Sequence, residues 1–139
     1  MEANELRIGN VIQCALNESL RLPDGVPHVV SAILPFGEVI VDLSPTSQTT
    51  TKCPIKHCSG IPLTPEWLER AAFEKNKIDR STYYELSFGN SKLMWYDNRL
   101  CYGVLGVSQY EFVDVLNIKH VHQLQNLYFA LTGHELEFK

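Results

Sequence analysis

The chain has 139 residues, 45% of them hydrophobic and 20% charged, which predicts one globular domain and excludes long disordered segments. Its formal net charge of −4 divides evenly at Pro62, with four Lys/Arg against six Asp/Glu before it and eight against ten after it, so neither half is a basic phosphate-binding module. No stretch approaches the roughly 20 apolar residues of a membrane helix, and the acidic start lacks the order of a signal peptide, so we expect a cytoplasmic protein.

Residues 6–43 predict a small antiparallel β unit with a barrel-like pattern. Alternating or β-branched runs are separated by turn signals, at Gly9-Asn10, Pro23-Asp24-Gly25 and Pro35-Phe36-Gly37. The strands expected from these runs span 6–12, 28–34 and 38–43. The polar stretch 44–51 predicts a loop; the alternative is an exposed edge strand, because threonine favours strands.

A helix start follows at Thr64. The Thr64 hydroxyl suits the N-cap, Pro65 suits the first helical position, and Glu66 faces the positive end of the helix dipole. The charged residues 74–80 predict a solvated connection.

The next segment predicts a four-stranded antiparallel meander. Apolar residues alternate in four short runs, and hairpin or turn signals separate them. The expected strands span 84–88, 92–96, 100–104 and 110–116.

The chain then predicts an amphipathic helix from His120 to Thr132, ended by Gly133. Its apolar residues recur at intervals of three and four and share one face: Val121, Leu124, Leu127, Tyr128 and Leu131. The meander is the nearest large apolar surface in the sequence, so we expect the helix to pack on it. On a helix, His120 and His122 would point in different directions. Leu136 and Phe138 predict a short tail strand.

Cys53, His57 and Cys58 form the most suggestive cluster, because thiolates and imidazole are zinc ligands. A structural zinc site needs four ligands, and no second cysteine pair of matching spacing exists. Cys14 and Cys101 lie in strand-like runs. We therefore interpret all four cysteines as reduced thiols, with Cys53 and Cys58 in a loop.

No catalytic residue or cofactor is predicted. Cys58 or Cys101 could be combined with His57, His120 or His122 as a nucleophile and base, but such a pair needs contact in space and a lowered thiol pKa, and the sequence shows neither. The chain also lacks phosphate-cradling glycine loops and dinucleotide fingerprints.

Two sets of side chains are candidates for an interaction surface. Aromatic residues of the meander, among them Trp95 and Tyr96, could stack single-stranded bases, although a packed core explains them better because few basic residues accompany them. On the last helix, Gln123, Gln125 and Asn126 lie mostly off the apolar stripe, so an outward working surface would be there.

Three segments resemble a family of small uncharacterised Bacteroidetes proteins, often found in prophage or mobile-element settings. They are LRIGN (6–10), IPLTPEWL (61–68) and, above all, the ending that contains HQLQNLYFALTG (122–133). The family has Tyr where this chain has His120 and Glu where it has His134, and neither difference touches the apolar stripe. The resemblance implies an intracellular accessory protein and brings no activity, cofactor or catalytic residue.

Together these features predict an α+β fold in a single domain, 1–139, with a β-rich part (1–60) and a part made of a helix, the meander and the last helix (61–139). A two-domain chain jointed near 59–62 is the alternative. The leading functional hypothesis is a non-enzymatic binding or adaptor module for protein or nucleic acid. The alternatives are a small-barrel nucleic-acid binder and a cysteine- or zinc-dependent enzyme. No membrane partner is expected, and a homo-oligomer stays open.

Overall fold

The structure is a computed structural model that describes residues 1–14, 26–44, 47–115 and 117–139. The predicted turn at Pro23-Asp24-Gly25 lies outside these residues. The chain divides into two compact units, each built on a five-stranded antiparallel sheet. The first unit comprises residues 1–62 and 120–135, and the second comprises 63–119 and 136–139. The α+β class is confirmed. Neither helix in the described ranges has the length and apolarity needed to cross a bilayer.

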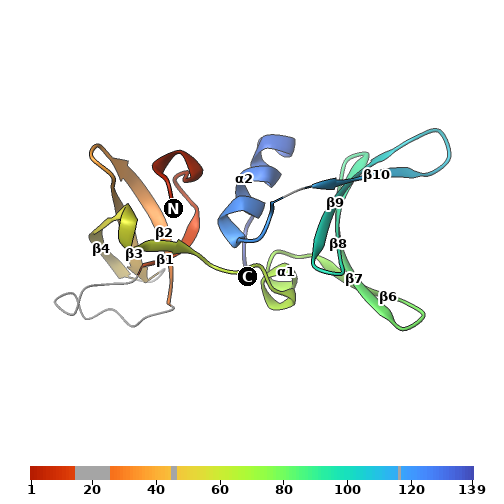
Figure 1. Cartoon of the computed structure of the whole chain (residues 1–139), viewed down its shortest axis with the longest axis horizontal. Helices are drawn as coiled ribbons and strands as arrows, with labels where there is room; N and C mark the ends of the chain where they lie inside the picture. Colours follow the sequence, from red (N-terminus) through yellow and green to blue (C-terminus); the bar gives the residue numbers. More distant parts are fainter. Residues whose placement is uncertain (15–25, 45–46, 116) are drawn as a thin grey trace. The chain divides into compact units, whose positions relative to one another are not determined.

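The first sheet has the strand order β4-β3-β2-β1-β5, and Figure 1 labels its strands β1 to β4. Its strands are β1 (Val11–Cys14), β2 (Pro27–Leu34), β3 (Glu38–Ser44), β4 (Ser47–Pro54) and β5 (Cys58–Gly60). The sheet is not a closed barrel, because no hydrogen-bonded ladder joins β4 to β5 in the described chain. The loop predicted at 44–51 is wrong and its alternative is confirmed, since β4 pairs with β3 as an edge strand.

Alternation explains which face of this sheet is buried. Ile12, Val30, Val39 and Val41 are fully buried, and Val30 pairs directly with Val41 across β2 and β3. The turn between these two strands holds Phe36 with a left-handed φ of 68° and is followed by Gly37 at 74°. A 3-10 turn, η2 (Ile55–His57), joins β4 to β5.

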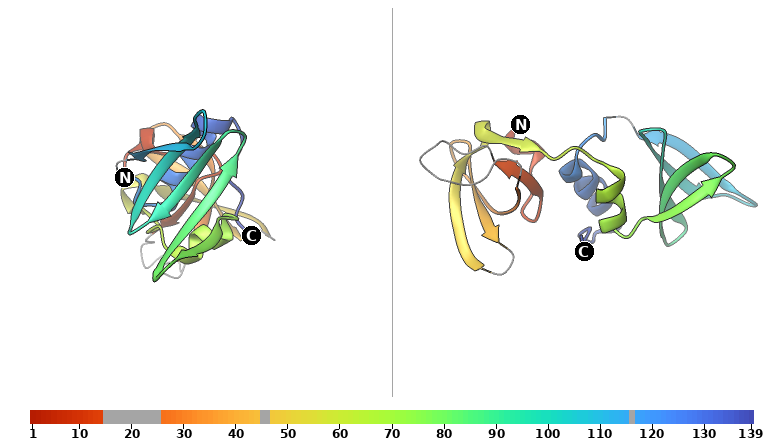
Figure 2. Two further views of the ribbon diagram at one scale, coloured as in Figure 1. Left: turned by 90° about the vertical axis from the view of Figure 1, so that its right-hand side faces the viewer. Right: turned by 90° about the horizontal axis from the view of Figure 1, so that it is seen from below.

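The second sheet is a meander in which each strand pairs with the next along the chain (Figure 2). It contains β6 (Glu74–Ile78), β7 (Ser81–Phe88), β8 (Ser91–Tyr96), β9 (Arg99–Leu105) and β10 (Tyr110–Val115). The prediction of four strands is wrong, because the sheet has five. The charged segment 74–80, predicted as a connection, contains β6. An edge strand tolerates such charges because its side chains remain largely in water.

Helix α1 (Pro65–Arg70) precedes this meander. Thr64 occupies the N-cap position as predicted, but its hydroxyl makes no cap bond. The prediction of a short strand at the C-terminal tail is wrong. The tail instead packs on α1: the Phe138 ring meets the Trp67 ring edge-on, with centroids 5.3 Å apart. The Lys139 N–H donates a hydrogen bond to the Arg70 carbonyl at 2.9 Å.

Helix α2 (Val121–Thr132) matches the predicted range, with His120 as N-cap and Gly133 in the left-handed stop position. Its predicted packing on the meander is wrong, because α2 belongs to the first unit and contacts β1. Periodicity identified the buried start of the stripe, Val121 and Leu124, while Leu131 is 37% exposed. Polar contacts hold α2 on the first unit, and they join Gln125 and Asn126 to residues more than a hundred positions earlier in the chain. A periodic pattern does not reveal such contacts.

Candidate functional site: a buried three-cysteine cluster

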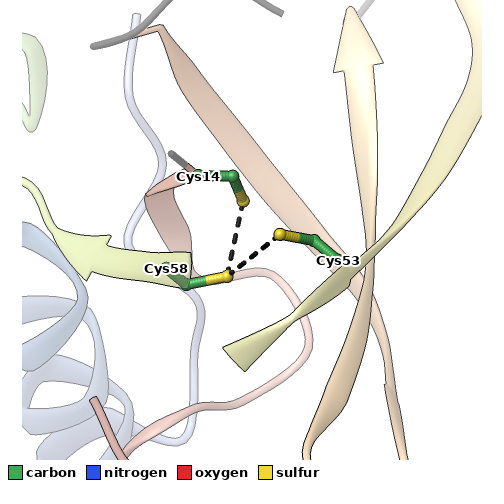
Figure 3. A group of neighbouring side chains, drawn as sticks. All are labelled: Cys14, Cys53 and Cys58. Carbon is green, nitrogen blue, oxygen red and sulfur yellow. Dashed lines mark hydrogen bonds between the residues drawn. The ribbon is translucent and has the colours of Figure 1, made fainter. Parts of the chain in front are cut away.

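Three cysteine side chains converge in the first unit (Figure 3). The Sγ of Cys58 lies 3.5 Å from that of Cys14 and 3.7 Å from that of Cys53. All three sulfur atoms lie within 4.8 Å of one another. The cluster therefore joins β1, β4 and β5, including both edge strands of the sheet.

Strand pairing and a tight turn place these thiols together. Cys14 is directly opposite Cys58 in the β1–β5 ladder, so the two side chains share one face of the sheet. Cys53 lies near the end of β4, and η2 turns the chain back so that β5 begins at Cys58. The interpretation of Cys53 and Cys58 as loop residues is therefore wrong.

The thiols are buried among apolar side chains. Cys14 and Cys53 are each 1% exposed and Cys58 is 5% exposed, and they belong to the same core cluster as Ile12 and Val30. With zinc–sulfur bonds of about 2.3 Å, tetrahedral geometry puts neighbouring sulfur atoms roughly 3.8 Å apart. The two short Sγ–Sγ distances, 3.5 and 3.7 Å, are close to that spacing.

The cluster favours a thiolate at Cys58 and protonated thiols at Cys14 and Cys53. The hydrogen bond that Cys14 donates to the Cys58 thiolate lowers the Cys58 pKa to about 7, against the opposing effect of burial. Burial, followed by the nearby Cys58 charge, raises the pKa of Cys53 to about 11. The hydrogen bond between Cys14 and Cys58 raises the pKa of Cys14 well above the usual range. A bound cation would replace the protons that Cys14 and Cys53 retain.

The structure changes the set of candidate metal ligands. Cys53 and Cys58 are brought together, but His57, which is half-buried in η2, is not among the grouped ligand atoms. Cys14 takes a place that the sequence analysis did not give it. Cys14 is buried like Ile12 two residues before it, but its neighbour Cys58 is 44 residues away and is found only through the pairing of β1 with β5.

Cys58 also lines a second feature, a pocket of about 210 Å³ that it shares with Gly60, His120 and His122. The two imidazole rings stack, with centroids 5.6 Å apart. The prediction that they diverge is wrong because His120 precedes the helix and has extended backbone angles. His122 is 3% exposed, and its Nδ1 has no hydrogen-bond partner in the part of the chain described here. Burial lowers the pKa of His122.

The stacked histidines pack where Gly60 has no side chain. A Cβ at this position would lie 2.6 Å from Cγ of His120 and 2.8 Å from Cε1 of His122. We expect Gly60→Ala to cost about 1–3 kcal/mol by overpacking, measured as a loss of hydrogen-exchange protection in the first unit. In the control Gly103→Ala, the atoms nearest to the Cβ would belong to the ring of Phe112, which is 42% exposed and can rotate away, so the cost should stay below about 1 kcal/mol. Equal costs would contradict the packing argument.

The fourth cysteine belongs to the second unit. Cys101 donates a hydrogen bond to Oδ1 of Asp114 at 3.1 Å, and burial raises its pKa to about 11. It therefore serves as an internal control for the three clustered thiols.

The predicted interaction residues separate into buried and accessible groups. Gln125 is 2% exposed and Trp95 is 7% exposed, whereas Tyr96 is 45% exposed. Asn126 is half-buried and donates to the Glu5 carbonyl at 2.8 Å. The Oε1 of Gln123 accepts the His120 N–H at 3.1 Å. These contacts give the side chains of Gln123 and Asn126 structural roles.

Comparisons with protein-family models, curated proteins and solved structures find no match.

Proposed function

We propose that the first unit is a binding module that holds one thiophilic metal ion through Cys14, Cys53 and Cys58. The observation that carries the proposal is the convergence of three buried sulfur atoms within 4.8 Å. Thiolates select soft or borderline ions such as Zn²⁺ and Cu⁺ over Mg²⁺ and Ca²⁺. Three protein ligands leave a fourth zinc position for water or another molecule.

A cation would also change the protonation of the three thiols. Only Cys58 has a lowered pKa, and the pKa values of the other two thiols are raised. An ion would favour three thiolates by direct coordination and release their protons. It would tie β1 to the two edge strands of the sheet, so its binding free energy would stabilise the folded first unit.

Titration of the chelator-treated, reduced protein with Zn²⁺ and Cu⁺ against competing chelators tests this proposal. We expect one ion per chain. Cys14→Ser, Cys53→Ser and Cys58→Ser should each weaken binding by more than roughly 100-fold, because losing a direct ligand exceeds the 10–100-fold cost of losing an outer partner. Cys101→Ser is the matched control and should bind like the parent.

Stability provides a second measurement. A free ion concentration 100 times Kd should raise the free energy of unfolding by about 2.7 kcal/mol. His57→Ala should bind normally because His57 lies outside the cluster. Binding that is equally strong in the parent and in the Cys14→Ser/Cys53→Ser/Cys58→Ser triple variant would overturn the proposal.

A further inference from the structure

The three clustered thiols differ in their access to small molecules. Cys58 lines the pocket of about 210 Å³, together with Ser59, Gly60, His120 and His122. Cys14 and Cys53 do not line it, and each is only 1% exposed. The pocket is smaller than the roughly 300–1,000 Å³ typical of drug-sized ligands. It can therefore admit only a small molecule, or one end of a larger one, beside Cys58.

Cys14 is positioned to react with a mixed disulfide formed at Cys58. Residues directly opposite each other in an antiparallel ladder have Cα atoms about 4.5–5.5 Å apart, inside the usual disulfide range of about 4.4–6.8 Å. The Cys14 and Cys58 sulfur atoms are already 3.5 Å apart, against about 2.05 Å in a disulfide. Side-chain rotation can close this gap while the β1–β5 pairing remains intact.

We infer that Cys58 is a site of thiol–disulfide exchange with low-molecular-weight disulfides, and that Cys14 resolves the product into a Cys14–Cys58 disulfide. In the first step the Cys58 thiolate attacks a disulfide RSSR, the S–S bond breaks, and RS⁻ leaves. In the second step the Cys14 sulfur attacks Sγ of Cys58 and expels the second RS⁻, while the thiol proton of Cys14 passes to solvent or to the leaving thiolate. In total, two protein thiols are oxidised and one RSSR is reduced to two RSH.

This inference goes beyond the proposed metal site, although it uses two of the same sulfur atoms. An ion held by the three cysteines would block exchange, and a Cys14–Cys58 disulfide would remove two of the three metal ligands. The two states of the cluster would therefore exclude each other.

The test uses the full chain with Cys101→Ser as background, reduced and treated with chelator, and oxidised glutathione as the probe. Intact mass and peptide mapping follow the products. In the background protein we expect a Cys14–Cys58 disulfide without a lasting adduct. Adding Cys14→Ser should trap one glutathione on Cys58. Adding Cys58→Ser should slow all modification at least about tenfold, because the remaining thiols lack access to the pocket.

A second measurement uses no substitution at Cys14, Cys53 or Cys58, so its result does not depend on whether those variants fold. In the background protein, brief alkylation followed by peptide mapping should label Cys58 before Cys14 and Cys53. Faster reaction at Cys14 or Cys53, a lasting adduct in the background protein, or a Cys53–Cys58 disulfide would each overturn the inference.

A separate arm repeats the exchange after loading with Zn²⁺. If the metal proposal is right, the ion slows exchange and chelator restores it. An unchanged rate with Zn²⁺ present would count against the metal proposal, whereas the pattern of products in the metal-free arm decides the exchange. Failure of one proposal is therefore distinguishable from failure of the other.

Discussion

Trp95→Ala is expected to lower the free energy of unfolding of the second unit by about 3–5 kcal/mol, the range for truncating a large buried aromatic side chain. Trp95 on β8 is directly opposite Tyr84 on β7 and Leu100 on β9. All three are at most 7% exposed, so they form a continuous buried row across the middle of the meander. Removing the indole ring would leave a cavity between its two cross-strand neighbours.

The adjacent residue supplies the control. Tyr96 points to the other face of β8, is 45% exposed, and donates a long 3.5 Å hydrogen bond to Ser81. Tyr96→Ala should change stability by no more than about 0.5 kcal/mol. Hydrogen exchange in peptides that cover β7 and β9 measures both variants without relying on Trp95 fluorescence. Similar losses in the two variants would show that the structure assigns the faces of β8 wrongly.

Gln125→Ala is expected to destabilise the first unit by about 2–5 kcal/mol. The Gln125 Oε1 accepts the Val11 N–H at 2.8 Å, and its Nε2 donates to the Gly9 carbonyl at 3.0 Å. Alanine would remove both bonds and leave two backbone groups without these partners, each at a cost of about 1–3 kcal/mol where water is excluded. Hydrogen exchange in peptides that cover β1 should show the loss locally.

Gln123→Ala is the matched control, because it removes the same atoms from the same helix. Gln123 is half-buried, and its Oε1 bonds to the His120 N–H at the start of α2. We expect a cost of about 1 kcal/mol. If Gln125→Ala were no more harmful than Gln123→Ala, the bond between α2 and β1 would contribute little to stability.

Local patterns predicted most of the secondary structure because they depend on neighbouring residues. Alternation located β8, where Leu93 and Trp95 are buried, and periodicity located α2. The same patterns failed where the outcome depends on distant partners. Leu124 fits an apolar stripe on any sheet, and contacts such as those of Gln125 and Asn126 with residues 5–11 place the helix in the first unit.

The candidate site was predictable only in part for the same reason. Cys53 and Cys58 are close in sequence and therefore attracted attention as potential ligands. Cys14 joins them through long-range strand pairing, which nothing in its local sequence specifies. His57 shares the sequence neighbourhood of Cys58, but the η2 turn places it outside the cluster.

The first unit is discontinuous in sequence, and this has a consequence for synthesis on the ribosome. Residues 63–119 separate β5 from α2, yet the Val121 N–H donates to the Ile61 carbonyl at 2.9 Å. At about 5–20 residues per second, translation of the intervening residues takes several seconds. During this interval β1 lacks the glutamine that bonds its backbone, while β6 to β10 are synthesised one after another. All strands of the second unit are therefore synthesised before α2, the element that completes the first unit.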